Sequence, residues 1–125
     1  MPRDVLLLEE MIEAAGQAVA LVQGVTVSEV AADRMRRDAL LWNFTVPGEA
    51  ATQLSEELRF RFPEVPWRQP ARLRNRLVHG YWSIDLDVVC TTAEQQLPSF
   101  IGELRRVLAM VISEGVSTVD GEPGH

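Results

Sequence analysis

The first part of the chain repeats its apolar residues at three- and four-residue intervals, which is the period of an amphipathic helix. Between Asp4 and Gln23 the recurring positions are Val5, Leu8, Met11 or Ile12, Ala15, Val19 and Val22. Gly24 follows where the pattern stops, as a glycine does at many helix ends. Thr26 and Glu29 have the spacing of a capping box, in which each side chain bonds to a backbone N–H near the other residue. The pattern predicts a helix over 4–23 and a short second helix that begins after Thr26.

A third helical pattern runs from about Asp33 to Leu54. Its apolar stripe consists of Met35, Ala39, Trp42, Val46, Ala50 and Leu54. Pro47 and Gly48 lie inside this pattern, and an interior proline removes a helical hydrogen bond at a cost of about 3 kcal/mol. We therefore expect the helix to kink or break between Phe44 and Gly48.

Two shorter helices are expected in the middle of the chain. One covers 55–60 and ends at the proline-containing segment 63–66. The other covers about 69–78 and places Pro70 in its first turn, where the missing N–H would have no helical partner in any case. Gly80 would end this helix.

The last helical pattern begins at Asp85, whose side chain can cap its first turn. Pro98 should bend it, and its apolar face consists of Ala93, Leu97, Phe100, Leu104, Val107 and Val111. No segment alternates with the period of two that strands require. The fold class is therefore all-α, an antiparallel helical bundle with one domain over 1–114 and a mobile C-terminal tail over 115–125.

Composition agrees with one small domain. The chain has 125 residues, of which 46% are hydrophobic, so it can bury one core but hardly two. Its single cysteine, Cys90, cannot form an internal disulfide, and no signal peptide or membrane-spanning run is present. We expect a cytoplasmic protein with no membrane partner.

The chain is acidic overall but contains two clusters of basic residues. The net charge of −6 argues against a nonspecific coat for nucleic acid, because phosphate contacts provide most nonspecific affinity. All twelve basic residues are arginine. The two clusters are Arg34, Arg36 and Arg37, and then Arg68, Arg72, Arg74 and Arg76. A local basic cleft is compatible with this pattern.

The sequence offers no obvious metal or phosphate-loop chemistry. Its two histidines are His79 and His125, and Cys90 lies in a different helical segment from either. These residues do not have the spacing of metal ligands. No glycine-rich phosphate loop and no serine on a strand-turn-helix elbow are present, so we expect neither a metal nor a cofactor.

Candidate chemistry is concentrated between Arg72 and Tyr81. At 100° per residue Leu73 and Leu77 should face the core. The opposite face then carries Arg72, Asn75, Arg76 and His79. A histidine can move protons near neutral pH and an arginine can stabilise negative charge on a phosphate, so the segment has the parts for metal-free RNA cleavage by the ribose 2′-hydroxyl.

Two problems with this site follow from the helix itself. Cleavage needs two proton transfers and the segment has one histidine, so we expect a homodimer that pairs two copies across a cleft. Arg74 lies about 140° from His79 around the helix axis, so bringing them together requires arginine's reach, a loosened helix end before Gly80, or the second subunit. The alternative is that this segment has no catalytic function. It would then be a solvated helix face on which Asn75 and His79 are hydrogen-bonded neighbours.

The motif also has a family resemblance. Arg74-Asn75 followed by His79-Gly80-Tyr81 matches the Arg-x4-His-x-Tyr motif of the HEPN superfamily, and the chain resembles its HepT-like group from about Arg3 to Val111. The surrounding landmarks agree: Asp33-Arg34-Met35, Asp38-Ala39, Gly48-Glu49-Ala50, Pro63-Glu64-Val65-Pro66-Trp67-Arg68, Asp85-Leu86 and Leu97-Pro98. Pro47 and Pro70 depart from the usual pattern and could reshape the cleft.

The resemblance implies a homodimeric, metal-independent endoribonuclease toxin of a type VII-like toxin-antitoxin system, with tRNA as a candidate substrate. It implies catalytic roles for Arg74 and His79, and a minimal nucleotidyltransferase antitoxin that attaches AMP to Tyr81. Substrate-binding or orienting roles go to Asn75, Arg72 and Arg76, and Glu49 is expected to pair with a cleft arginine. Two alternatives stay open: a noncatalytic subunit that binds a nucleotide or the nucleotidyltransferase, and a chain that is only a substrate for AMP transfer.

Overall fold

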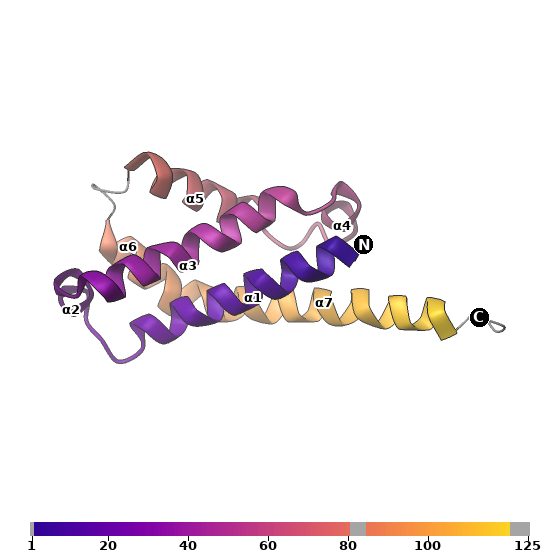
Figure 1. The fold of residues 1–125 in the computed structure, drawn as a ribbon, viewed down its shortest axis with the longest axis horizontal. Coiled ribbons are helices and arrows are strands. Elements are labelled where there is room, and N and C mark those ends of the chain that lie inside the picture. The colour runs from indigo at the N-terminus through magenta and orange to yellow at the C-terminus, as the bar shows by residue number, and fades with distance from the viewer. Residues whose placement is uncertain (1, 81–84, 121–125) are drawn as a thin grey trace.

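The computed structural model describes residues 2–80 and 85–120, and of residues 2, 78, 79 and 115–120 it describes the backbone alone. All regular structure within these ranges is helical (Figure 1), so the predicted all-α class is confirmed. The elements in chain order are α1 (Pro2–Val22), α2 (Val27–Ala32), α3 (Arg34–Gln53), α4 (Glu56–Arg61), α5 (Arg68–Gly80), α6 (Leu86–Thr91), the π-helical turn η2 (Thr92–Gln96) and α7 (Leu97–Asp120).

The long helices form an antiparallel bundle. Helix α1 packs against α3 and α7, and α3 also packs against α5. Along the chain the long helices alternate in direction, so that α1 and α5 run one way and α3 and α7 the other (Figure 1). Helix α5, which carries the Arg74 to His79 motif, therefore lies on the far side of α3 from α1.

The helix starts follow from short-range capping. Thr26 and Glu29 form the predicted capping box at α2, with hydrogen bonds of 3.1 and 3.0 Å. Asp33 caps α3, Ser55 caps α4 and Asp85 caps α6. Each cap gives a hydrogen-bond acceptor to an N–H that has no partner within its helix.

A buried carboxylate joins two of these starts. Asp4, in the first turn of α1, is the one charged residue that is buried among the described residues. It accepts hydrogen bonds from the backbone N–H of Ser55 at 2.9 Å and from the Ser55 hydroxyl at 2.6 Å. The start of α1 is thereby tied to the start of α4, an interaction between distant segments that no local pattern indicated.

The apolar side chains form two clusters. One joins α1, α4 and α7 around Leu8, Leu58 and Leu104. The other joins α3, α5 and α6, and its buried members include Leu40, Leu41, Phe44, Leu77, Val89 and Cys90. Leu77 is fully buried and Leu73 packs on the second cluster, so the predicted inward face of α5 is confirmed.

The predicted stripe of α3 is wrong in its first half. Met35 is 85% exposed and Trp42 is 64% exposed, whereas Leu40, Leu41 and Phe44 are buried. Helix α3 is covered by α1 on one side and by α5 on another, so its buried surface is broad and lies on a different angular sector from the predicted stripe.

Helix α3 also passes through its proline without a break. It is continuous from Arg34 to Gln53 with Pro47 inside, so the expected break is wrong, while a kink at this proline stays a prediction. Side-chain bonds reinforce the preceding turns, since Asn43 donates to the carbonyl of Ala39 at 2.8 Å and Thr45 to that of Leu41 at 2.9 Å. One missing N–H is absorbed because the neighbouring helical bonds and the packing on both sides remain.

The C-terminal helical stretch is confirmed at its Asp85 cap and on its apolar face, but not at its C-terminal end. The predicted stripe from Ala93 to Val111 faces the core. Just before Pro98, the turn η2 widens to a π-helix, in which the N–H of Leu97 bonds to the carbonyl of Thr92. Helix α7 continues to Asp120, so it reaches six residues past the predicted boundary at 114. The mobility of the segment 115–125 stays a prediction.

No helix in the described ranges is both long enough and apolar enough to cross a bilayer.

Candidate active site

Helix α5 lies very close to α3 at one point, Gly48. A Cβ atom added to Gly48 would lie 2.5 Å from the carbonyl oxygen of Pro70 and still closer to the Cβ of Arg74. Such distances are below van der Waals contact, so only glycine permits this approach. Pro70 is in the first turn of α5, as predicted. Gly48 thus sets how near the backbone of the motif helix lies to α3.

Arg74 is held by two neighbours. Its guanidinium lies 3.0 Å from the carboxylate of Glu49 on α3 and donates a second bond of 3.0 Å to the side-chain oxygen of Asn75. The predicted pairing of Glu49 with an arginine is confirmed, and its partner is Arg74. The ion pair is partly exposed, which makes it an orienting contact more than a stabilising one.

His79 and Tyr81 fall at the edge of what the structure describes. The backbone of His79 belongs to the last turn of α5, which stays helical to Gly80, while its side chain and all of Tyr81 lie outside the described residues. The helix end before Gly80 is therefore not loosened. Arg74 is engaged by Glu49, and the pairing of two copies of the motif across a homodimer stays a prediction.

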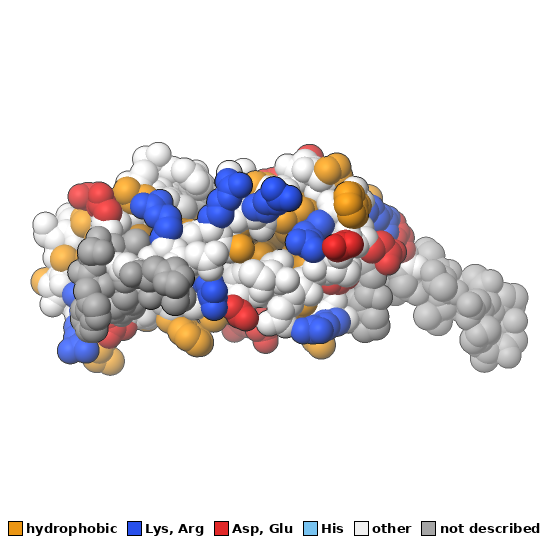
Figure 2. Space-filling model, turned by 90° about the horizontal axis from the view of Figure 1, so that it is seen from above, with side chains coloured by type: hydrophobic (Ala, Val, Ile, Leu, Met, Phe, Trp, Pro, Cys, Tyr) orange, Lys and Arg blue, Asp and Glu red, His pale blue; other side chains and the backbone are white. Residues whose placement is uncertain are grey.

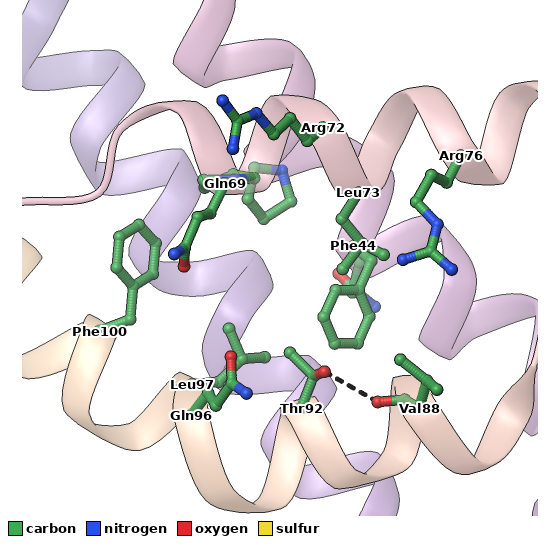
Figure 3. A pocket seen from close by; sticks show the side chains of 13 residues that line it. Phe44, Gln69, Arg72, Leu73, Arg76, Val88, Thr92, Gln96, Leu97 and Phe100 are labelled. Carbon is green, nitrogen blue, oxygen red and sulfur yellow. Dashed lines mark hydrogen bonds between the residues drawn. The ribbon is translucent and has the colours of Figure 1, made fainter.

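The other predicted site residues lie on the outer face of α5. Arg72, Asn75 and Arg76 are exposed. Arg72 and Arg76 border a groove between α5 and the α6–α7 segment, with a volume of about 230 Å³. The groove floor is apolar and comes from three segments, with Phe44 of α3, Leu73 of α5 and Phe100 of α7 among its side chains (Figure 3).

The two unusual prolines both line this groove. Pro47 and Pro70 belong to its wall, so they do shape the surface beside the motif helix. In Figure 3 the Arg76 side chain points toward the α6 side of the groove near Val88, while Arg72 points away from the floor. The groove combines an apolar floor with guanidinium groups at its margin, which is the combination that suits a nucleotide base and its phosphate.

The described residues contain no set of three or more His, Cys, Asp or Glu side chains arranged to hold a metal ion. Cys90 is buried, and burial raises the pKa of its thiol above the ordinary value. It is therefore protonated at neutral pH and is not an activated nucleophile.

Comparison with known proteins decides the family. The model of the family described as "Ribonuclease HepT-like" matches residues 11–107, a range that includes α3 and the whole of α5. The chain belongs to the HepT-like ribonuclease family. The resemblance of its motif and landmarks to this group is thereby confirmed, and membership supports ribonuclease activity.

Two HepT-like relatives match this chain along most of their own length. The "Probable ribonuclease HepT" of Thermococcus cleftensis is 26% identical over 100 residues, which cover 80% of this chain and 91% of the relative. The "Putative RNase MJ0127" of Methanocaldococcus jannaschii is 25% identical over 112 residues, which cover 90% of this chain and 93% of the relative. No solved structure gives a significant match.

The HepT-like motif could be found from sequence, but the surfaces beside it could not. Phe44 and Phe100 line the groove although they lie 56 positions apart along the chain. Each sits in an apolar stripe and so looks like an ordinary core residue. Gly48 gave a signal as an interruption of α3 and as a family landmark, but its close approach to Pro70 and Arg74 required the packed helices.

Proposed function

We propose that this chain is a metal-independent endoribonuclease whose catalytic groups are Arg74 and His79. The observation that carries the proposal is the HepT-like match over 11–107, because it includes the helix that bears both residues. The orientation of Arg74 by Glu49 adds support, since a guanidinium held in place loses less entropy when it binds a phosphate. RNA is the substrate class, with tRNA as a candidate.

The chemistry needs no metal. The imidazole of His79 takes the proton of a ribose 2′-hydroxyl, whose oxygen bonds to the adjacent phosphorus while the bond from phosphorus to the 5′-oxygen breaks. The imidazolium of a second copy gives its proton to that leaving oxygen. Arg74 stabilises the charge on the nonbridging oxygens, with Arg72, Asn75 and Arg76 binding or orienting the strand. The products are a 2′,3′-cyclic phosphate and a 5′-hydroxyl.

The two-histidine mechanism requires a homodimer with one composite cleft, which can be tested by subunit mixing. Wild-type and His79→Ala chains are unfolded together in equal amounts and refolded, and cleavage is measured. Because only wild-type homodimers retain both histidines, about one quarter of the wild-type rate is expected, not one half. A rate of one half, in proportion to the wild-type chains present, would mean that each chain has its own complete site. Refolded wild type alone is the control.

We further propose that a nucleotidyltransferase antitoxin silences the toxin by attaching AMP to Tyr81. Tyr81 follows His79 by two positions, so a nucleotide there would add negative charge beside the catalytic group. Incubation with the partner enzyme and ATP is expected to add the mass of one AMP to the wild type and none to Tyr81→Phe. The same incubation is expected to abolish cleavage by the wild type but not by Tyr81→Phe. AMP on Tyr81→Phe would place the modification elsewhere.

The rival function is a noncatalytic binding subunit, in which Arg74 stays paired with Glu49 and does not bind the scissile phosphate. The guanidinium of Arg74 is already engaged by Glu49 and Asn75. The rival predicts binding of a nucleotide, or of the nucleotidyltransferase, without RNA cleavage at any protein concentration. The third possibility, that the chain is only a substrate for AMP transfer, predicts modification of Tyr81 in a protein with no activity to lose.

A further inference from the structure

A second groove lies beside the motif helix, where α4 and the 63–67 segment meet the start of α5. Its volume is about 570 Å³, and its walls include Glu56, Arg59, Phe60, Arg68 and Arg72. Figure 2 looks onto the face that carries α5 and shows arginine side chains in a row across it. We call this the Phe60 groove.

Among the described residues, the arginines of the Phe60 groove differ from the other basic cluster in having no ion pair with a carboxylate. Arg34, Arg36 and Arg37 each lie 3.5 to 3.7 Å from the carboxylate of Asp33 or Asp38. Within the described ranges no carboxylate lies within ion-pair distance of Arg59, Arg68, Arg72 or Arg76. In an acidic chain, unneutralised arginines gathered on one face indicate an anionic ligand.

The spacing of these arginines leads toward the motif. Arg68, Arg72 and Arg76 are four residues apart on α5, so they follow one side of the helix over about 12 Å. Arg72 lines both the Phe60 groove and the apolar groove beside the motif. A ligand that follows this row therefore passes from one groove to the other, as an extended polyanion can and a single small anion cannot.

The groove also presents an aromatic side chain to solvent. Phe60 is 80% exposed at the end of α4, although a phenylalanine normally gains by burial. An aromatic face beside arginines is how proteins hold single-stranded nucleic acid, since bases stack on the ring and phosphates meet the guanidinium groups. Glu56 would repel a phosphate on its side, but it can accept a hydrogen bond from a base amino group.

We infer that the Phe60 groove binds a single-stranded segment of the RNA substrate, with a base stacked on Phe60 and phosphates on Arg59, Arg68 and Arg72. This inference rests on the proposed ribonuclease function and extends it to a substrate-binding surface outside the motif. A duplex cannot use the ring in this way because its bases are already stacked. The groove therefore favours substrates with an unpaired segment next to the cleaved bond.

Binding of a labelled, uridine-rich single-stranded RNA of about twelve nucleotides, a length suited to one such groove, tests the inference. Fluorescence anisotropy is measured in EDTA at several salt concentrations, with His79→Ala as the background so that the RNA stays intact. Phe60→Leu keeps an apolar side chain without the ring, and Phe60→Trp keeps a ring. Arg68→Gln removes one groove charge. Arg105→Gln is the matched control, since Arg105 is exposed on α7 and has no ion pair in the described ranges.

Phe60→Leu is expected to weaken binding by about fivefold or more, with Phe60→Trp close to the parent. Arg68→Gln is expected to lower the slope of log affinity against log salt by about one, which Arg105→Gln leaves unchanged. Unchanged binding in Phe60→Leu and Arg68→Gln, in a protein whose wild type cleaves RNA, overturns the groove and leaves the nuclease standing. Loss of binding in these variants, with no cleavage by the wild type, supports the groove and contradicts the nuclease. Equal competition by polyglutamate, insensitive to Phe60→Leu, indicates a protein-binding surface and overturns the inference.

Discussion

Replacement of His79 by alanine is expected to lower the rate of RNA cleavage by about 10²- to 10⁴-fold, because it removes the group that we propose moves protons in the transition state. Arg74→Ala is expected to lower the rate by about 10²- to 10³-fold, through loss of charge stabilisation on the phosphate. The fold should survive both changes, since α5 is anchored to the core by Leu77 and Leu73. Single-turnover cleavage of a labelled RNA measures both effects.

The control for these variants is Arg105→Ala, which removes an exposed arginine of α7 and should cleave RNA like the wild type. Circular dichroism and thermal unfolding establish that each variant is folded. Cleavage by folded His79→Ala at the wild-type rate would remove this residue from the mechanism. An effect confined to KM in Arg74→Ala would make Arg74 a substrate-binding residue and not a stabiliser of the transition state.

Gly48→Val is expected to have the largest effect of any change outside the motif. The new side chain would collide with the carbonyl of Pro70 and with the base of the Arg74 side chain, so α5 must move away from α3. Overpacking of this kind costs about 1 to 3 kcal/mol of unfolding free energy. Because the same movement separates Arg74 from Glu49, cleavage should fall as well. Urea unfolding and the cleavage rate are measured on the same preparation.

Gly102→Ala is the matched control. Gly102 lies within α7, and an added Cβ there meets no other atom within 4 Å. Alanine favours a helix interior over glycine by up to about 1 kcal/mol, so this variant should be as stable as the wild type or more stable, with unchanged cleavage. Wild-type stability in Gly48→Val would mean that the two helices do not approach as closely as described.

Helices with strong local signals could be predicted from the sequence. The capping box at Thr26, the cap at Asp85 and the stripe of α7 all depend on residues within one or two turns of each other. The pairing of Glu49 with an arginine was expected from the family resemblance, and the structure identifies that arginine as Arg74. These features are local or shared within the family, so they do not depend on knowing how the helices pack.

The predictions that the structure did not confirm depend on packing between distant segments of the chain. Two stripes of helical period are present in α3, and the choice between Met35 with Trp42 and Leu40 with Phe44 is made by which sides α1 and α5 cover. The unbroken course of α3 through Pro47 is likewise supported by neighbours on both sides. The Phe60 groove could not be foreseen, because it needs α4 and the start of α5 side by side.

Metal-independent cleavage by His79 is tested most directly by incubating RNA with the purified wild-type protein in excess EDTA and analysing the product ends. The cleavage rate is expected to be the same in EDTA and in added magnesium, with 2′,3′-cyclic phosphate and 5′-hydroxyl ends, and no cleavage is expected by His79→Ala purified in the same way. Cleavage that EDTA abolishes, or a folded wild-type protein that leaves RNA intact, would contradict this mechanism.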